Sequence, residues 1–280
     1  MASRLRERPP WKQRQETLMS DTGAMTGALL CGHGSRDEEA RTEFERFVAA
    51  TRKTFLARRL LIAIEGAYLE FLHPTIDEGF AKLAHSGASH VVAQPLMLFA
   101  ARHAKKDVPG EAAAFAASHP RLRINCGQEL TLNAKLVAAA ADRVNKVEAT
   151  SKSAARRSDT LLLVIGRGSS DQKANGTLTD LASKLQQLLG MAKADIAYAG
   201  MAEPSVADGL AEAARQKYPR VIVLPYFLFT GVLVKRIRAL TEETVSQHPA
   251  IEFLVAQHLS DHPLVVETVV DHIEELAQPN

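Results

Sequence analysis

The chain has 280 residues, of which 46% are hydrophobic, 24% are charged and 5% are aromatic. This composition is typical of a folded globular protein and excludes a disordered or fibrous one, while the formal net charge of +2 excludes a general electrostatic affinity for nucleic acid. The two cysteines, Cys31 and Cys126, lie far apart and form no CxxC motif, which excludes a zinc-finger, iron–sulfur or disulfide framework.

The first 24 residues are polar, with basic and acidic side chains interspersed, and they lack the apolar segment of a secretory signal. We interpret residues 1–24 as a disordered N-terminal extension that precedes the first predicted strand. Further along the chain, the apolar runs are shorter than the roughly 18 residues that a membrane-spanning helix needs. We therefore expect a cytoplasmic protein that has neither a membrane partner nor a nucleic-acid partner.

From residue 27 onward, short apolar runs alternate with segments of helical periodicity. The apolar runs predict buried strands at 27–31, 60–67, 89–96 and 122–126. The periodic segments predict helices at 36–56, 75–86, 107–118 and 130–146. An alternation of this kind is typical of a parallel sheet that helices cover on both faces.

The second half of the chain repeats this plan, with predicted strands at 160–165, 194–199, 220–227 and 251–256. The sequence "GHGSRD" at 32–37 returns as "GRGSSD" at 166–171. Residues 73–103 also align with residues 203–233, and the prolines and glycines of the two segments coincide. The sequence therefore predicts an α/β protein of two similar flavodoxin- or Rossmann-like domains, each with a roughly four-stranded parallel sheet and helices on both faces.

The polar, basic stretch "EATSKSAARRS" separates the two repeats and has the composition of a linker. We place an N-terminal domain at 25–147, the linker at 148–158 and a degenerate C-terminal repeat at 159–280. We expect the active site in the cleft between the domains, because ligands of parallel sheets bind beyond the carboxyl ends of the strands.

Three ionisable residues follow successive strands of the first repeat, namely His33, Glu70 and His103. The second repeat has Arg167, Gly200 and Leu233 at these positions. Because the second repeat keeps the glycines of the turn without the histidine, the fold itself does not require His33. Two imidazoles and a carboxylate suit a divalent cobalt, iron, nickel or zinc ion. His73 is a weaker fourth candidate, since it also suits the start of a helix.

The segments "GHGSRD", "YLEFLHPTI" and "PLMLFAARHAKKDVP" resemble those of the sirohydrochlorin chelatases, which are class II tetrapyrrole chelatases. The resemblance covers the chain from residue 25 onward and fits the long form with two fused repeats. It implies insertion of a divalent metal into sirohydrochlorin in cobalamin or siroheme biosynthesis. Co²⁺ is favoured by similarity to the long forms, and Fe²⁺ or Ni²⁺ are the alternatives.

The resemblance also implies roles for individual residues. His33, His103 and Glu70 would handle the metal, which is a substrate, and no organic cofactor is implied. Sirohydrochlorin carries eight carboxylates, so its pocket should contain cations and hydrogen-bond donors. Our candidates for this role are Ser35, Arg36, Arg102, Arg167, Ser169, Lys235 and Arg236. Arg167 would face the substrate across the cleft, or it would be a solvated loop residue of a decayed repeat.

Several other functions fit the sequence less well. A histidine phosphatase has an arginine directly before its histidine, whereas Gly32 precedes His33. The segment "GHGSRD" completes neither G-x-S-x-G nor G-x-G-x-x-G, which argues against a serine hydrolase and a dinucleotide site. A carrier that binds metal or tetrapyrrole without turnover stays open as an alternative. Because the repeats are fused, a monomer is plausible.

Overall fold

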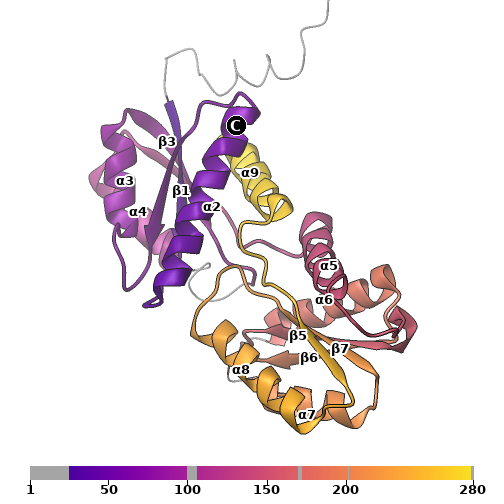
Figure 1. The fold of residues 1–280 in the computed structure, drawn as a ribbon. Coiled ribbons are helices and arrows are strands. Elements are labelled where there is room, and N and C mark those ends of the chain that lie inside the picture. The colour runs from indigo at the N-terminus through magenta and orange to yellow at the C-terminus, as the bar shows by residue number, and fades with distance from the viewer. Residues whose placement is uncertain (1–24, 100–105, 170–171, 201, 279–280) are drawn as a thin grey trace, which may run out of the picture.

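A computed structural model of the chain describes residues 25–99, 106–169, 172–200 and 202–278. The predicted disordered extension, residues 1–24, lies outside the described residues. The described residues form two four-stranded parallel sheets with the strand orders β2-β1-β3-β4 and β6-β5-β7-β8 (Figure 1). Helices cover both faces of each sheet, so the predicted α/β fold class is confirmed. No helix of the described part combines the length and the apolar composition that a bilayer crossing requires.

The two halves have the same order of elements. The first sheet consists of β1 (Met25–Gly32), β2 (Ala63–Tyr68), β3 (Ala88–Pro95) and β4 (Arg123–Cys126). Its half also contains α2 (Glu38–Ala57), α3 (Ile76–His85), α4 (Val108–Ser118) and α5 (Ala134–Glu148). The second sheet consists of β5 (Thr160–Gly166), β6 (Lys193–Tyr198), β7 (Arg220–Pro225) and β8 (Glu252–Val255). Its helices are α6 (Gln172–Leu189), α7 (Val206–Arg215), α8 (Val232–Gln247) and α9 (Pro263–Ala277).

The predicted strands all occur, although one of them begins later than its apolar run. The apolar run predicts a strand that begins at residue 60, but β2 begins at Ala63 because a tight turn first ends α2. Arg59 adopts a left-handed backbone conformation with φ 60°, and the Leu60 N–H donates to the Phe55 carbonyl oxygen at 3.0 Å. Leu60 is therefore a buried anchor of the turn and not part of the sheet.

Matching helix caps place the turns of the two halves alike. Thr75 and Glu78 form a capping box at the start of α3. At the start of α7, the Ser205 side chain accepts a hydrogen bond from the Asp208 N–H at 3.2 Å. These caps satisfy N–H groups that the first helical turn leaves without partners. In both halves, the turn that follows the second strand therefore ends in a helix capped in the same way.

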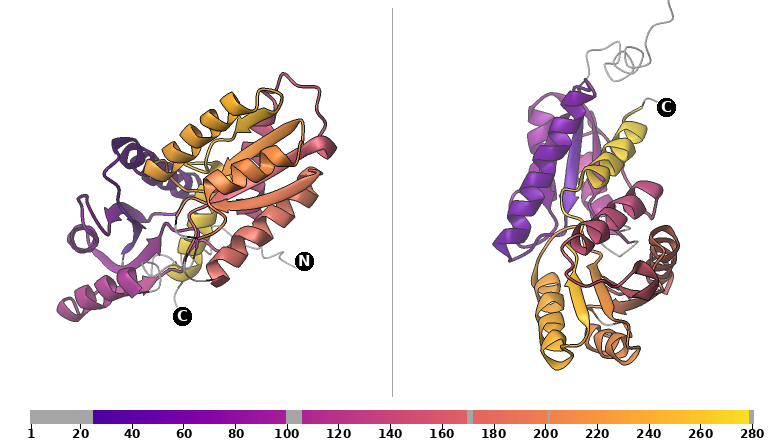
Figure 2. Two further views of the ribbon diagram at one scale, coloured as in Figure 1. Left: turned by 90° about the horizontal axis from the view of Figure 1, so that it is seen from below. Right: turned by 45° about the vertical axis from the view of Figure 1, so that its right-hand side comes forward.

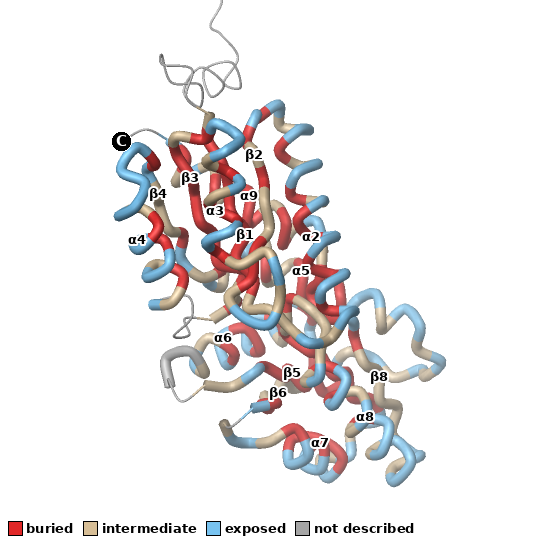
Figure 3. Tube along the Cα trace, turned by 90° about the vertical axis from the view of Figure 1, so that its left-hand side faces the viewer, coloured by how far each residue is buried: buried red, intermediate tan, exposed pale blue. Residues whose placement is uncertain are grey.

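Alternate residues of the central strands face different apolar layers. In β1, Ala28 and Leu30 belong to a core that continues through both halves, whereas Leu29 and Cys31 face the outer layer of α3 and α4. This alternation follows from the two-residue period of a strand. Figure 3 shows the central strands as buried segments beneath partly exposed helices. The strand runs are apolar throughout because both faces of each sheet are covered.

The last helix of each half packs on the sheet of the other half. Helix α5 packs against α6, β7 and β8, while α9 packs against α2 and β3 (Figures 1 and 2). Arg58, the C-cap residue of α2, forms ion pairs with Asp271 at 2.9 Å and Glu274 at 2.8 Å on α9. The predicted boundary at 148–158 separates the two sequence repeats. Because the helices are exchanged, however, residues on one side of this boundary pack against the sheet on the other side.

The segment predicted as a linker is held by a buried arginine. Arg220 at the start of β7 is 3% exposed and forms ion pairs with Glu148 at 3.1 Å and Glu252 at 2.9 Å. Its Nη2 also donates to Ser151 Oγ at 3.1 Å and to the Ser153 carbonyl oxygen at 3.2 Å. A buried guanidinium with this many partners fixes the connection between the halves against the second sheet.

We expect Arg220→Met to lower the free energy of unfolding by about 3 kcal/mol, because it leaves the partly buried Glu252 without its cation and leaves Glu148 with Arg157 alone. Urea denaturation at neutral pH measures this change. The matched control is Arg156→Met, since Arg156 is 80% exposed in its pair with Asp159 and should lose less than about 1 kcal/mol. Equal losses in the two variants would contradict the structural role of Arg220.

Candidate active site

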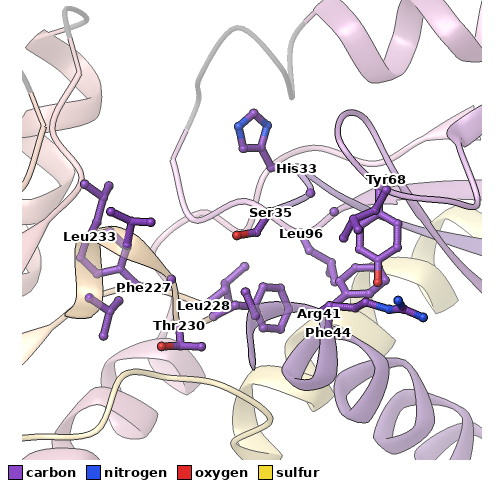
Figure 4. Close-up of a pocket in the computed structure, with 18 of the residues that line it drawn as sticks. His33, Ser35, Arg41, Phe44, Tyr68, Leu96, Phe227, Leu228, Thr230 and Leu233 are labelled. Carbon is purple, nitrogen blue, oxygen red and sulfur yellow. The ribbon is translucent and has the colours of Figure 1, made fainter. Parts of the chain in front are cut away.

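The carboxyl ends of the central strands meet at a cleft between the two halves. A cavity of about 330 Å³ occupies this cleft and is lined by residues of both repeats (Figure 4). Its polar lining residues include His33, Ser35, Arg41, Arg167 and Thr230. Its apolar lining residues include Phe44, Tyr68, Leu72, Leu96, Leu228 and Phe229. The cavity thus combines a broad apolar surface with an imidazole and two guanidinium groups.

The turn that carries His33 is fixed by its neighbours. The Glu70 N–H donates to the His33 carbonyl oxygen at 3.1 Å, and the Leu69 N–H donates to the Gly32 carbonyl oxygen at 3.0 Å. Gly34 has φ 92°, and a side chain there would collide with the Glu70 carbonyl oxygen. Only glycine meets both conditions. The two turns that follow β1 and β2 are therefore locked together, which brings the backbones of His33 and Glu70 side by side.

Glu70 opens onto a second cavity beside the first one. Its exposed side chain lines a polar space of about 370 Å³ together with Lys106, Asp107 and Glu111. His103 and Arg102, which the sequence analysis assigned to metal and substrate, lie outside the described residues. Among the residues that the structure does describe, no group of three His, Cys, Asp or Glu side chains is arranged to hold a metal ion. The predicted roles of His33, Glu70 and His103 in metal handling stay predictions.

The predicted substrate-binding residues of the two equivalent turns have different surroundings. Ser35 lines the cavity, and its Oγ accepts a hydrogen bond from the Asp37 N–H at 3.1 Å. Arg167 also lines the cavity and is exposed, so it shares this space with His33 although the two belong to different repeats. The backbone of Ser169 is held by Asn175, whose side chain bonds its N–H at 2.9 Å and its carbonyl oxygen at 2.8 Å.

The predicted basic residues of α8 lie beside the cavity lining. Lys235 forms ion pairs with Asp37 at 2.8 Å and Glu39 at 3.3 Å, which join α8 to the start of α2. The hydrogen bond from Lys235 lowers the pKa of Asp37. Arg236 is exposed on the same helix, and Arg36 is exposed and lies over the Phe71 ring. Substrate binding by these side chains stays a prediction, and in this structure Lys235 joins the two halves.

Arg41 is a lining residue that the sequence analysis did not single out. It lies one turn into α2, exposed, in an ion pair with Glu45 at 2.8 Å. Because the helix period puts positions 37, 40, 41 and 44 on one face, the predicted helix at 36–56 could have indicated it. Phe44, on the same face, packs against Tyr68 at a centroid distance of 4.6 Å and against Phe229 at 5.8 Å.

A buried carboxylate holds the two walls of the cavity together. Glu43 on α2 accepts hydrogen bonds from His258 Nε2 at 2.8 Å and from the Thr230 N–H at 2.7 Å. Burial raises the pKa of Glu43, but these hydrogen bonds outweigh it and hold the pKa below its usual value. Since Thr230 lines the cavity, Glu43 of the first repeat positions a loop of the second repeat.

Each half is an α/β unit with a parallel sheet, and the two halves enclose a cleft at the ends of their strands. This arrangement is that of the two-repeat chelatase fold. The chain belongs to the CbiX family, whose model matches residues 27–147 and 161–276. It is 30% identical over 246 residues to a sirohydrochlorin ferrochelatase of Priestia megaterium, and the alignment covers 88% of each of the two chains. A sirohydrochlorin cobaltochelatase of the same organism is 28% identical over 251 residues, covering 90% of this chain and 80% of that relative.

The fold also matches a solved structure over most of both chains. SirB from Bacillus subtilis with Fe³⁺ has a TM-score of 0.78 and 26% sequence identity to this chain. The match covers 90% of this chain and 96% of SirB. The family resemblance that the sequence motifs indicated is therefore confirmed.

We expect Glu43→Gln to lower the free energy of unfolding by about 2 kcal/mol at neutral pH, because hydrogen bonds to a charged acceptor are replaced by weaker ones. The folded-state pKa of Glu43 lies below the unfolded value of about 4.3, so this stabilisation is complete above that value and is lost as the pH falls through the folded-state pKa. Urea denaturation of both proteins across the acid range measures the difference. A difference that does not shrink on acidification would contradict the assignment.

Proposed function

We propose that this chain is a sirohydrochlorin chelatase, which inserts a divalent metal ion into the tetrapyrrole sirohydrochlorin. The observation that carries the proposal is one cavity lined by His33 and Arg167, which occupy the same position in two copies of one turn. An imidazole suits a transition-metal ion, and a guanidinium suits a carboxylate. A single cleft thereby offers one group for each of the two substrates.

Insertion requires the macrocycle to lose two pyrrole N–H protons while the metal exchanges its ligands for ring nitrogens. The neutral imidazole of His33 can bind the incoming ion or accept a proton near neutral pH. The exposed carboxylate of Glu70, whose backbone is bonded to that of His33, can accept a second proton or orient the ion. We propose that His103 completes this set, as its position in the family motif implies.

The rest of the cavity suits the tetrapyrrole. Its apolar surface, with Phe44, Leu96 and Phe229, can contact the face of the macrocycle, while peripheral carboxylates reach the guanidinium groups of Arg167 and Arg41. Because one chain supplies both walls, we propose that a monomer carries the complete site. Co²⁺ is our first candidate for the metal, and Fe²⁺ is the second.

We expect His33→Ala to lower kcat/KM for metal insertion by about 100-fold or more, because it removes a group that binds the metal or takes up a proton. An anaerobic absorbance assay with sirohydrochlorin and either Co²⁺ or Fe²⁺ measures this loss. The control is His85→Ala, since His85 is exposed on α3 and forms a hydrogen bond with the Ala81 carbonyl oxygen of the same helix at 2.8 Å. It should leave the rate unchanged.

Two outcomes would count against catalysis at His33. If His33→Ala inserts metal as fast as wild type, the imidazole has no catalytic role. If wild-type protein binds sirohydrochlorin and metal but never exceeds the uncatalysed rate, the chain is a carrier and not a chelatase.

We expect Arg167→Ala to raise KM for sirohydrochlorin by about ten-fold, because a charged hydrogen bond to a carboxylate is lost, and to leave KM for the metal unchanged. The same assay with each substrate varied in turn measures both constants. Arg215→Ala is the control, since Arg215 is an exposed arginine paired with Glu212 on α7. Unchanged constants in Arg167→Ala would identify Arg167 as a solvated residue of a decayed repeat.

A further inference from the structure

An exposed aromatic ring, that of Phe71, lies next to His33, which lines the cavity. Phe71 is 56% exposed, although burying such a side chain is worth about 2 kcal/mol. Its neighbour Leu72 is one of the residues that line the cavity. The two residues therefore extend the apolar surface of the cavity outward, past His33.

The backbone at Phe71 adopts a conformation that L-residues avoid. Its φ is 67°, and the Leu72 N–H donates to the Glu70 carbonyl oxygen at 2.9 Å, which closes a γ-turn around Phe71. Turns of this kind with a positive central φ are rare and strained. Strained backbone persists where its surroundings fix it, and it concentrates at functional sites. Here the Glu70 carbonyl group is fixed against Gly34 of the His33 turn.

The neighbours of Phe71 leave part of its ring open. The guanidinium of Arg36 lies over the ring, with its Cζ atom 5.0 Å from the centroid. The His33 imidazole stands almost perpendicular to it, at 87° and a centroid distance of 6.5 Å. The half-exposed Phe71 ring therefore lies beside the imidazole that lines the cavity.

The size of the cavity also requires a contact surface outside it. Its volume of about 330 Å³ is at the low end for drug-sized ligands, whose sites span about 300–1,000 Å³. A tetrapyrrole with eight carboxylate arms is larger than such a ligand. Part of it therefore extends beyond the cavity, where the exposed apolar side chains of the described residues include Phe71, beside His33, and Val232 of the cavity lining.

Resting on the function proposed above, we propose that the Phe71 ring, backed by the Arg36 guanidinium, is a platform on which the protruding part of the tetrapyrrole stacks. The platform sets the plane of the macrocycle beside His33. Arg36 keeps the ring in place through a cation–π contact and offers its remaining N–H groups to a peripheral carboxylate. Phe71 is thus a substrate-binding residue that contacts the tetrapyrrole and not the metal.

The test compares wild type with Phe71→Gly and Phe71→Tyr. Glycine adopts a positive φ without strain, so Phe71→Gly should fold with the thermal midpoint of wild type. Binding of metal-free sirohydrochlorin, followed by its absorbance and fluorescence, should weaken about ten-fold in Phe71→Gly, within the range of aromatic stacking energies. Phe71→Tyr keeps the ring and should restore binding. KM for Co²⁺ should not change in either variant.

The matched control is Leu61→Gly, because Leu61 is a 67% exposed apolar residue that precedes the amino end of β2, whereas Phe71 follows the carboxyl end of that strand. It should bind sirohydrochlorin as wild type does. If wild type inserts metal and Phe71→Gly binds sirohydrochlorin equally tightly, the platform is wrong and the proposed function stands. If wild type does not bind sirohydrochlorin, both proposals fail.

Discussion

A parallel sheet must have both of its faces covered, and in this protein neither half covers both faces of its own sheet without a helix of the other half. Helix α5 leaves the first half to pack on β7 and β8, and α9 returns from the second half to pack on α2 and β3. One apolar core consequently runs through both halves. This exchange sets how the strand ends face each other, and every contact across the cleft depends on it, including those that Glu43 makes with Thr230 and His258.

The turn that follows the first strand of each repeat keeps an equivalent backbone hydrogen bond in both copies, while the side chain at its second position differs. Equivalent backbone hydrogen bonds hold each copy, from Leu69 to Gly32 in the first and from Ala199 to Gly166 in the second. The side chain at position 33 or 167 takes no part in these bonds. The same backbone turn therefore carries an imidazole in the first repeat and a guanidinium in the second.

Local patterns predicted the strands, the helices and the repeat, because the two-residue period of a strand and the 3.6-residue period of a helix can be recognised within a short stretch of sequence. The exchange of α5 and α9 was not predictable in this way, since either helix could cover either sheet with the same apolar stripe. Within the site, the turn glycines indicated His33, and the repeat indicated Arg167. Phe71 and Arg41 were missed, because an exposed phenylalanine or a helix-surface arginine is unremarkable until the fold brings it to the cleft.

The helix exchange also determines how the molecule comes apart. Separating the halves would uncover the inner face of both sheets at once, because each sheet would lose the helix that the other half supplies. Neither half can then keep a complete core of its own. We therefore expect both sheets and the cleft to be lost together on melting, so that a ligand bound in the cleft stabilises the whole chain.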